Sequence, residues 1–291
     1  MAYSATGTAG NDTLNQVGDT GPGTIVGLAG DDSILTGTGS ATVTGDSGND
    51  VVILQAGNTG TVSGGTETDV IFAPTGTGSM VLFGNECADS VFFGLSSAAQ
   101  TILGGNDSAD GADTLEAGSG ADLIFGNGGA DTVRDDTNAT VIGGFGNDSL
   151  FTSSNGSSND LIFGNEGNDS VCDNGGSDTV FAGLGNDSIF LAGGGSAQVF
   201  GNEGGDTINT STSTRSITIA GGNDSADGGD SIFTGSGADF VFGNGGADSI
   251  RTSSGDDTVV GGFGNDDVDA FNGNGLLFGN EGNDTLESAG G

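Results

Sequence analysis

An aspartate recurs along this chain at intervals of 17 to 24 residues. The fifteen aspartates of this series, called the main column below, are Asp12, Asp32, Asp50, Asp69, Asp89, Asp113, Asp131, Asp148, Asp169, Asp187, Asp206, Asp230, Asp248, Asp266 and Asp284. An aliphatic residue follows each one by two positions, and a glycine precedes each by two positions except where Glu67 and Cys87 stand. A carboxylate, a turn glycine and an aliphatic residue that recur together indicate a solenoid of stacked coils.

Each coil contains two short apolar runs, and no stretch shows the spacing of a helix. The first run follows the aspartate, and the second precedes the next glycine-rich loop. The inward position of the second run is always aliphatic, at Ile25, Val43, Val62, Leu82, Ile102, Ile124, Val141, Ile162, Val180, Val199, Ile219, Val241, Val259 and Leu277. The pattern predicts an all-β solenoid of about 15 turns, in which two parallel sheets enclose a thin aliphatic core.

The composition excludes several classes of protein. With 62 glycines and a formal charge of -37 in 291 residues, the chain would ordinarily be disordered, but its aliphatic residues are too regularly spaced for that. We therefore expect a fold that needs counter-ions. The chain has no lysine and no histidine, so no basic patch is available to bind nucleic acid. No apolar run approaches the roughly 18 residues that span a bilayer, so we expect no membrane insertion.

A longer repeat lies above the short one. The segment GGNDSADG occurs at 104–111 and again at 221–228, an offset of 117 residues. The two copies related by this offset cover roughly residues 84–170 and 201–285. We interpret this as internal duplication within one continuous domain, 1–291. Cys87 and Cys172 fall about four coils apart, roughly 19 Å, which is too far for a disulfide.

The glycine–aspartate loops offer the ligands that calcium prefers. Calcium takes six to eight oxygen ligands from carboxylates and main-chain carbonyls, and glycine allows a tight loop to direct several carbonyls at one point. Aspartates stacked about 5 Å apart repel one another unless a cation lies between them. The fifteen aspartates leave fourteen gaps, and about 14 calcium ions would change the formal charge from -37 to about -9. The alternative is that these acids only keep a sheet edge soluble, but solubility does not require the accompanying glycine and aliphatic residue.

Two segments carry a resemblance to a known family. Residues 143–151, GGFGNDSLF, and 261–269, GGFGNDDVD, resemble the nonapeptide GGxGxDxUx of the RTX, or haemolysin-type, calcium-binding repeats. This resemblance implies a right-handed parallel β-roll that calcium folds, in a secreted bacterial protein. It also implies that Asp148 ligates one ion together with Asp131 and another together with Asp169, and the other main-column aspartates take the same role.

The chain departs from the repeat pattern in two ways. Glu67 and Cys87 replace the turn glycine, which puts the ions near Asp69 and Asp89 in doubt. The edge opposite the main column is incomplete, and its candidate ligands are Asp122, Asp160, Asp178, Asp239 and Asp257. We therefore expect a one-sided roll, with a calcium row along one edge and mostly Ser/Thr hydrogen bonding along the other.

Two further groups of residues leave alternatives open. The inserted acids Asp107, Asp110, Asp224 and Asp227 either bind extra ions or are solvated loop residues. Phenylalanines occupy outward positions on both strands of the coils, at Phe72, Phe83, Phe92, Phe125, Phe151, Phe163, Phe190, Phe200, Phe233, Phe242 and Phe278. These rings either form a lateral contact surface or stack to shield the sheet.

An enzyme is not expected, because the chain has no histidine and its carboxylates form a uniform series rather than one cleft. Neither end of the series shows a capping element, so we expect copies of the chain to associate head to tail as well as laterally. The sequence thus predicts a calcium-dependent structural protein of the bacterial cell exterior, such as a filament, sheath or S-layer subunit. The alternative is an accessory or adhesin module of a larger secreted RTX protein, and cell-surface glycans stay open as partners. A regular Thr/Asn array for binding ice is missing.

Overall fold

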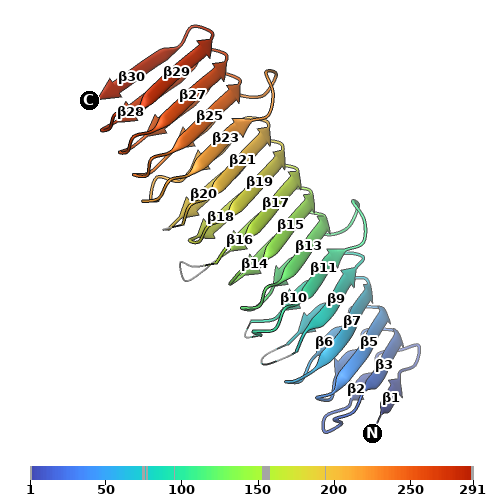
Figure 1. Ribbon diagram of the computed structural model, residues 1–291. Coiled ribbons are helices and arrows are strands. Elements are labelled where there is room, and N and C mark those ends of the chain that lie inside the picture. The colour runs from blue at the N-terminus through green and yellow to red at the C-terminus, as the bar shows by residue number, and fades with distance from the viewer. Residues whose placement is uncertain are drawn as a thin grey trace. The chain divides into compact units, whose positions relative to one another are not determined.

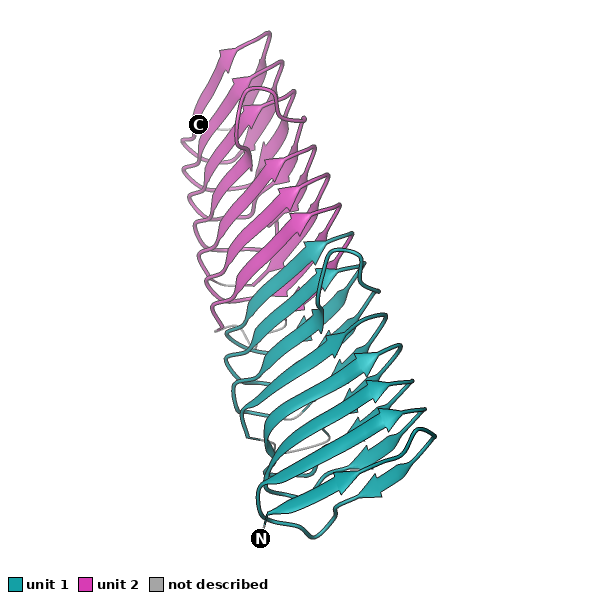
Figure 2. Ribbon diagram, turned by 90° about the vertical axis from the view of Figure 1, so that its right-hand side faces the viewer, with its two compact units in different colours: residues 1–146 teal, residues 147–291 magenta. Residues whose placement is uncertain are grey.

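The computed structural model describes residues 2–73, 76, 78–94, 96–152, 158–193 and 195–289, and these contain β-strands and no helix. The chain divides into two compact units, Met1–Gly146 and Asn147–Gly291, coloured separately in Figure 2. Each unit is a parallel β-solenoid, and the strands of both make about fifteen turns, which confirms the predicted fold class. The prediction of one continuous domain stays a prediction.

In the first unit the odd-numbered strands form one parallel sheet and the even-numbered strands another (Figure 1). The odd-numbered strands are β1 (Tyr3–Thr6), β3 (Gly23–Ala29), β5 (Ser40–Ser47), β7 (Thr59–Thr66), β9 (Met80–Asn85), β11 (Thr101–Gly105), β13 (Leu123–Gly128) and β15 (Thr140–Phe145). The even-numbered strands are β2 (Thr13–Asn15), β4 (Ser33–Leu35), β6 (Val51–Ile53), β8 (Val70–Phe72), β10 (Ser90–Phe92), β12 (Thr114–Glu116) and β14 (Thr132–Asp135).

The second unit repeats this arrangement. Its odd-numbered strands are β17 (Leu161–Glu166), β19 (Thr179–Leu184), β21 (Gln198–Glu203), β23 (Thr218–Gly222), β25 (Phe240–Gly245), β27 (Thr258–Phe263) and β29 (Leu276–Glu281). Its even-numbered strands are β16 (Ser149–Thr152), β18 (Ser170–Asn174), β20 (Ser188–Ala192), β22 (Thr207–Asn209), β24 (Ser231–Phe233), β26 (Ser249–Thr252), β28 (Asp267–Phe271) and β30 (Thr285–Ala289). Each strand pairs with the strand one coil away, so equivalent residues of successive coils lie side by side.

The two predicted aliphatic columns form the core. In the odd-numbered strands every inward aliphatic from Ile25 to Val259 is at most 1% exposed, and only Leu277 is half-buried. In the even-numbered strands the aliphatics that follow the aspartates are equally buried, apart from Leu14 and Leu286. Because each buried Val, Ile or Leu contributes about 1.5–3 kcal/mol, these columns are the main apolar contribution to the stability of the coils.

A third inward column, which the sequence analysis missed, lies four positions after each aspartate. Its buried members are Thr36, Leu54, Ala73, Phe93, Ala117, Asp135, Thr152, Asp173, Leu191, Thr210, Thr234, Thr252 and Ala270. Strand alternation carried two residues beyond the aliphatic would have found it. The interior is therefore wider than predicted, and polar residues fill much of its side opposite the main column.

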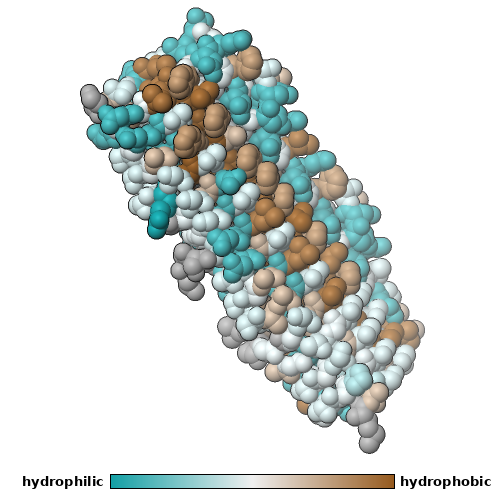
Figure 3. All heavy atoms as spheres, in the orientation of Figure 1, coloured by the Kyte–Doolittle hydropathy of each residue, from teal (hydrophilic) through white to brown (hydrophobic). Residues whose placement is uncertain are grey.

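An outward apolar row crosses the odd-numbered sheet. Strand register aligns it in the second unit as Phe163, Phe181, Phe200, Ala220, Phe242, Val260 and Phe278. The rings of Phe163, Phe181 and Phe200 are stacked nearly parallel, with centroids 5.2 and 4.8 Å apart. Phe242 and Phe278 are 36% and 48% exposed, and Figure 3 shows apolar side chains gathered over these strands. Stacking is therefore present among three of the rings, while Phe242 and Phe278 are partly exposed, and the lateral contact surface stays a prediction.

No helix able to cross a membrane occurs among the described residues. The two cysteines are free thiols, with Cys87 exposed and Cys172 half-buried.

Candidate metal-binding edge

Each main-column aspartate ends a short loop with an unusual backbone. In the loop Gly261–Asp266, φ is +123° at Gly262 and +131° at Gly264. Asparagine takes the place of the first of these glycines in six other loops, with φ from 72° to 86°, at Asn85, Asn127, Asn165, Asn202, Asn244 and Asn280. Glycine and asparagine tolerate this left-handed region better than other residues. The alternation of Gly-Gly and Gly-Asn in the sequence therefore follows from one repeated loop conformation.

The main-column aspartates form a hydrogen-bonded ladder within each unit. The backbone N–H of Asp32 donates to Oδ1 of Asp50 at 2.7 Å, and the N–H of Asp169 donates to Oδ1 of Asp187 at 2.7 Å. The same bond joins the pairs 12/32, 50/69, 69/89, 89/113, 113/131, 148/169, 187/206, 206/230, 230/248, 248/266 and 266/284, at 2.7 to 3.1 Å. In each of these pairs, one oxygen of the later carboxylate thus accepts a hydrogen bond from the backbone of the preceding coil.

The second oxygen of most of these carboxylates is buried without a hydrogen-bond partner. This holds for Oδ2 of Asp32, Asp50, Asp69, Asp89, Asp113, Asp169, Asp187, Asp206, Asp230, Asp248 and Asp266. Leaving a buried polar atom unpaired costs about 1–3 kcal/mol, and more when it is charged. A repeated row of such oxygen atoms indicates that a bound ligand, rather than another group of the protein, is their partner.

Glycine lines the space into which these oxygens point. A side chain on Gly27 would collide with Oδ2 of Asp32 and with the carbonyl oxygen of Gly45, one coil away. Gly45 stands in the same relation to Asp50 and Gly64, and Gly201 to Asp206 and the carbonyl of Gly221. A carboxylate oxygen and a main-chain carbonyl therefore approach each other in successive coils, where calcium would find the hard oxygen ligands it requires. The main column fits calcium.

Burial raises the pKa of eight main-column carboxylates to between about 6 and about 8. The pKa is about 6 for Asp50 and Asp206, about 7 for Asp69, Asp89, Asp113, Asp187 and Asp248, and about 8 for Asp230. The hydrogen bond from the preceding aspartate's N–H opposes the rise in pKa, and the neighbouring carboxylates add to it. Without a cation, these groups hold protons at pH values where an ordinary aspartate is ionised.

The two loops without a turn glycine keep the common geometry. Glu67 and Cys87 take φ of 78° and 76°, in the region that glycine occupies in the other loops. Asp69 and Asp89 are 1% and 2% exposed and remain in the ladder. Both loops therefore keep their aspartates in the ladder with a backbone angle that is strained for Glu and Cys, and the effect on ion binding there stays a prediction.

The opposite edge combines buried aspartates with neutral polar residues. Asp122, Asp160, Asp178, Asp239 and Asp257 are all at most 3% exposed. The N–H of Asp160 donates to Asp178 and the N–H of Asp239 to Asp257, both at 2.9 Å. Elsewhere Gln100 takes this role, since its Oε1 accepts from the N–H of Met80, whereas Asn58 instead donates from its side chain to Oγ1 of Thr36 at 3.0 Å.

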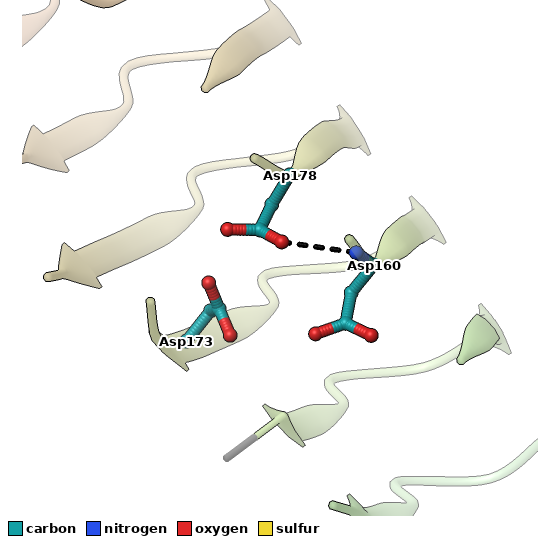
Figure 4. Close-up of side chains that lie close together, drawn as sticks. All are labelled: Asp160, Asp173 and Asp178. Atoms are coloured by element: carbon teal, nitrogen blue, oxygen red, sulfur yellow. Dashed lines mark hydrogen bonds between the residues drawn. The ribbon is translucent and has the colours of Figure 1, made fainter. Parts of the chain in front are cut away.

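Two aspartates of the third inward column join this edge. Burial raises the pKa of Asp122, and a hydrogen bond with Asp135 lowers it. Asp173 lies beside Asp160 and Asp178, and one carboxylate oxygen from each of these three lies within 4.8 Å of the others (Figure 4). Burial, followed by the adjacent Asp178, raises the pKa of Asp173 to about 8. Neither Asp135 nor Asp173 was predicted as a site residue, because both fall outside the main period.

The inserted acids separate into two kinds. The first acid of each insertion accepts a hydrogen bond from its own loop: Asp107 from the N–H of Ala109 and Asp224 from that of Ala226. The second acids, Asp110 and Asp227, turn inward, and their Oδ2 atoms are buried without a hydrogen-bond partner. The second acid of each insertion therefore resembles the main column, whereas the first acid caps a turn.

Comparison with known families agrees with this arrangement. The family model of the RTX calcium-binding nonapeptide repeat matches residues 17–52, 107–134, 135–155, 154–189, 233–268, 251–286 and 269–291. These matches cover more than half of the chain, and the two loops with Glu67 and Cys87 lie in the unmatched stretch 53–106. No curated protein matches the chain.

Proposed function

The chain belongs to the RTX calcium-binding nonapeptide repeat family, and from that premise we propose that it is a calcium-folded structural protein of the cell exterior which associates with copies of itself. The row of buried, unpartnered Oδ2 atoms carries the calcium part of this proposal. The extracellular location rests on the family, since RTX repeats are typical of secreted proteins. The proposed role is structural rather than catalytic, because the carboxylates form a repeated edge.

Calcium binding is expected to drive folding. With a formal charge of -37 and few cations, the coils repel one another when no ion is bound. Ions held between the main-column carboxylates and the loop carbonyls replace this repulsion with coordination, so the free energy of binding becomes free energy of folding. Circular dichroism should show β-structure appearing as calcium rises from chelator to millimolar levels. An unchanged spectrum throughout the titration would contradict the proposal. Magnesium at equal concentration and ionic strength controls for charge screening.

The self-association part of the proposal rests on the outward apolar row. A second copy is the occupant we propose for it, because partly exposed Phe200, Phe242 and Phe278 lie on one sheet face in register. The high negative charge opposes such contact until calcium neutralises it, so association should depend on calcium. The head-to-tail contact expected from the sequence stays a prediction.

Substituting the row tests the lateral contact. Replacing Phe163, Phe200 and Phe242 by serine should abolish calcium-dependent assembly while leaving the calcium-induced circular dichroism change intact. Light scattering and electron microscopy measure the assemblies. Replacing Phe72 and Phe190, outward rings of the even-numbered sheet, by serine is the matched control and should leave assembly unchanged. Persisting assembly in the triple variant would show that these rings serve only the fold.

The second candidate function is an accessory module of a larger secreted RTX protein. The uniform, repeated edge favours it, because nothing in the ladder requires a second copy of the chain. A protein that folds with calcium yet stays monomeric at high concentration would support this module and contradict the filament or S-layer role.

A further inference from the structure

The two insertions in the main-column edge form loops that the coils do not need for closure. Each insertion lengthens the step between two main-column aspartates to 24 residues, from Asp89 to Asp113 and from Asp206 to Asp230. Both steps keep the hydrogen bond of the ladder, at 2.8 Å. Figures 1 and 2 show the insertions as loops that stand out from the coils, one after β11 and one after β23. The tips of these loops therefore take no part in the ladder.

Both loop tips carry the tripeptide Asn-Asp-Ser, at residues 106–108 and 223–225. The aspartate of each tripeptide caps its own turn, as described above. The side chains of Asn106, Ser108, Asn223 and Ser225, in contrast, make no hydrogen bond with any described residue, and all four residues are exposed. The fold thus leaves an asparagine amide and a serine hydroxyl free at the same place in both loops.

An asparagine followed two positions later by serine or threonine is the acceptor sequence of N-linked glycosylation, provided that the residue between them is not proline. The chain contains ten such tripeptides, and one of them begins at Asn155, outside the described residues. The nine others begin at Asn11, Asn106, Asn138, Asn147, Asn168, Asn186, Asn209, Asn223 and Asn283. The motif by itself does not tell which of them a glycosyltransferase can reach.

The folded structure closes seven of these nine tripeptides. In three of them Oδ1 of the asparagine accepts an N–H of the next coil and the middle residue is a buried aspartate, as at Asn147. In two others the side-chain amide donates to a neighbouring coil, from Asn11 and Asn283. In the last two the middle residue, Ala139 or Thr210, is buried. Since a transferase must bind both the amide and the hydroxyl of its acceptor, only the two insertion loops remain open to it.

We propose that Asn106 and Asn223 are acceptors of an N-linked glycan. The donor is a sugar diphosphate carried on a nucleotide or a lipid. The amide nitrogen forms a bond to the anomeric carbon of the sugar, and the bond from that carbon to a phosphate oxygen breaks. The diphosphate leaves with the electron pair, and the amide proton passes to a base of the transferase. This inference goes beyond the proposed function, because it concerns a covalent modification rather than calcium. A glycan is bulky and hydrophilic, so it keeps this edge free of contacts between copies.

Peptide mass spectrometry of the protein isolated from its own organism tests the proposal. The expected result is sugar on Asn106 and Asn223 and none on the seven closed asparagines. Absence of sugar from Asn106 and Asn223 would overturn the inference, and calcium-dependent folding of the same sample would leave the proposed function standing. Sugar on Asn147 or Asn168 as often as on Asn106 would also overturn it, because the folded structure would then not select the acceptors.

Substitutions of the hydroxyl residue separate glycosylation from folding. Ser108→Ala should remove the sugar from Asn106 and leave that on Asn223, whereas Ser108→Thr should retain both. Ser149→Ala, which breaks the closed tripeptide at Asn147, is the matched control and should not change the sugar content. The calcium-induced circular dichroism change should be the same in all three variants. Sugar that stays on Asn106 in Ser108→Ala would contradict N-linked transfer at this loop.

Labelling of the purified protein with UDP-glucose and a soluble N-glycosyltransferase measures access to the acceptors. In millimolar calcium, glucose should appear on Asn106 and Asn223 alone. In chelator, where the coils are expected to open, it should appear on Asn147 and Asn168 as well. Equal labelling of Asn147 in both conditions, or failure to label the two insertion loops in calcium, would overturn the proposal.

Discussion

At the scale of single residues, the loops depend on backbone angles that few side chains tolerate. In ten main-column loops the residue two positions before the aspartate is a glycine with positive φ, from Gly30 to Gly282. Glu67 and Cys87 hold the same region with full side chains, at φ of 78° and 76°. A left-handed conformation costs a residue other than glycine about 1–2 kcal/mol. The first prediction follows from this strain.

Replacing Cys87 or Glu67 by glycine should stabilise the folded protein. Relief of strain exceeds the extra entropy that glycine adds to the unfolded chain, so each change should raise the free energy of unfolding in calcium by about 0.5–1 kcal/mol. Urea denaturation measures the difference. Glu86→Gly, at a neighbouring position whose φ is not positive, is the matched control and should destabilise the protein. Equal effects at positions 86 and 87 would show that strain is not the cause.

At the scale of the coil, the ladder explains why aspartate recurs rather than asparagine. One oxygen accepts a backbone N–H from the coil before it, a role that asparagine could also fill, as in the bond from Asp169 to Asp187. The other oxygen lies beside a glycine and a main-chain carbonyl, where the NH2 group of an asparagine could not ligate a cation. The charge is therefore unfavourable in the bare protein and favourable only when a cation is bound.

The effect of Asp187→Asn on the stability of the protein should consequently have opposite signs without and with calcium. In chelator near pH 8 the variant should be more stable than the parent, because it removes a buried carboxylate whose pKa burial raises to about 7. In millimolar calcium it should be less stable, because a ligand is lost, with Tm differences of about 2–4 °C per kcal/mol. Differential scanning calorimetry in both buffers measures this. Asp256→Asn, at an exposed aspartate, should show no such reversal. Destabilisation in both buffers would mean that the carboxylate is needed for the fold itself.

At the scale of the molecule, protons and calcium compete for the same carboxylates. Since burial raises the folded-state pKa of eight main-column aspartates to about 6 to 8, above the usual 3.8, the metal-free folded state binds more protons than the unfolded state across that interval. The stability of the metal-free protein is then fullest below the unfolded pKa and declines as pH rises through the folded values. This is opposite to ordinary acid denaturation.

We therefore predict that the chelated protein gains β-structure as the pH falls from about 8 to about 4.5, where the carboxylates are protonated. With calcium in excess the trend should reverse, because acid displaces the ion. Circular dichroism at fixed ionic strength follows both series. Metal-free stability that increases with pH would show that the buried carboxylates are not what limits folding.

Much of the fold and of the main column was predictable from the sequence. The coils, the parallel sheets and two aliphatic columns follow from a period that keeps a constant separation between aspartate and aliphatic residue, as in Asp148 and Leu150 or Asp266 and Val268. In a solenoid each coil contacts only its neighbours, so this short period is enough to define the fold. The period of the main column was also visible in the sequence, because a repeated loop conformation leaves a repeated glycine and carboxylate, and its role as a row of calcium ligands stays a prediction. These features are local, so the order of residues along the chain is sufficient to define them.

Only the tertiary structure determined which oxygens are left without partners and which carboxylates meet across the interior. Asp173 lies outside the main period, and nothing along the chain links it to Asp160, thirteen positions earlier in another coil. Likewise, the glycine five positions before most main-column aspartates is needed for space beside the carboxylate, which is evident only when the two sheets face each other. Such contacts depend on the closure of the coil and on the distance between sheets. Those are properties of the folded chain that no local period contains.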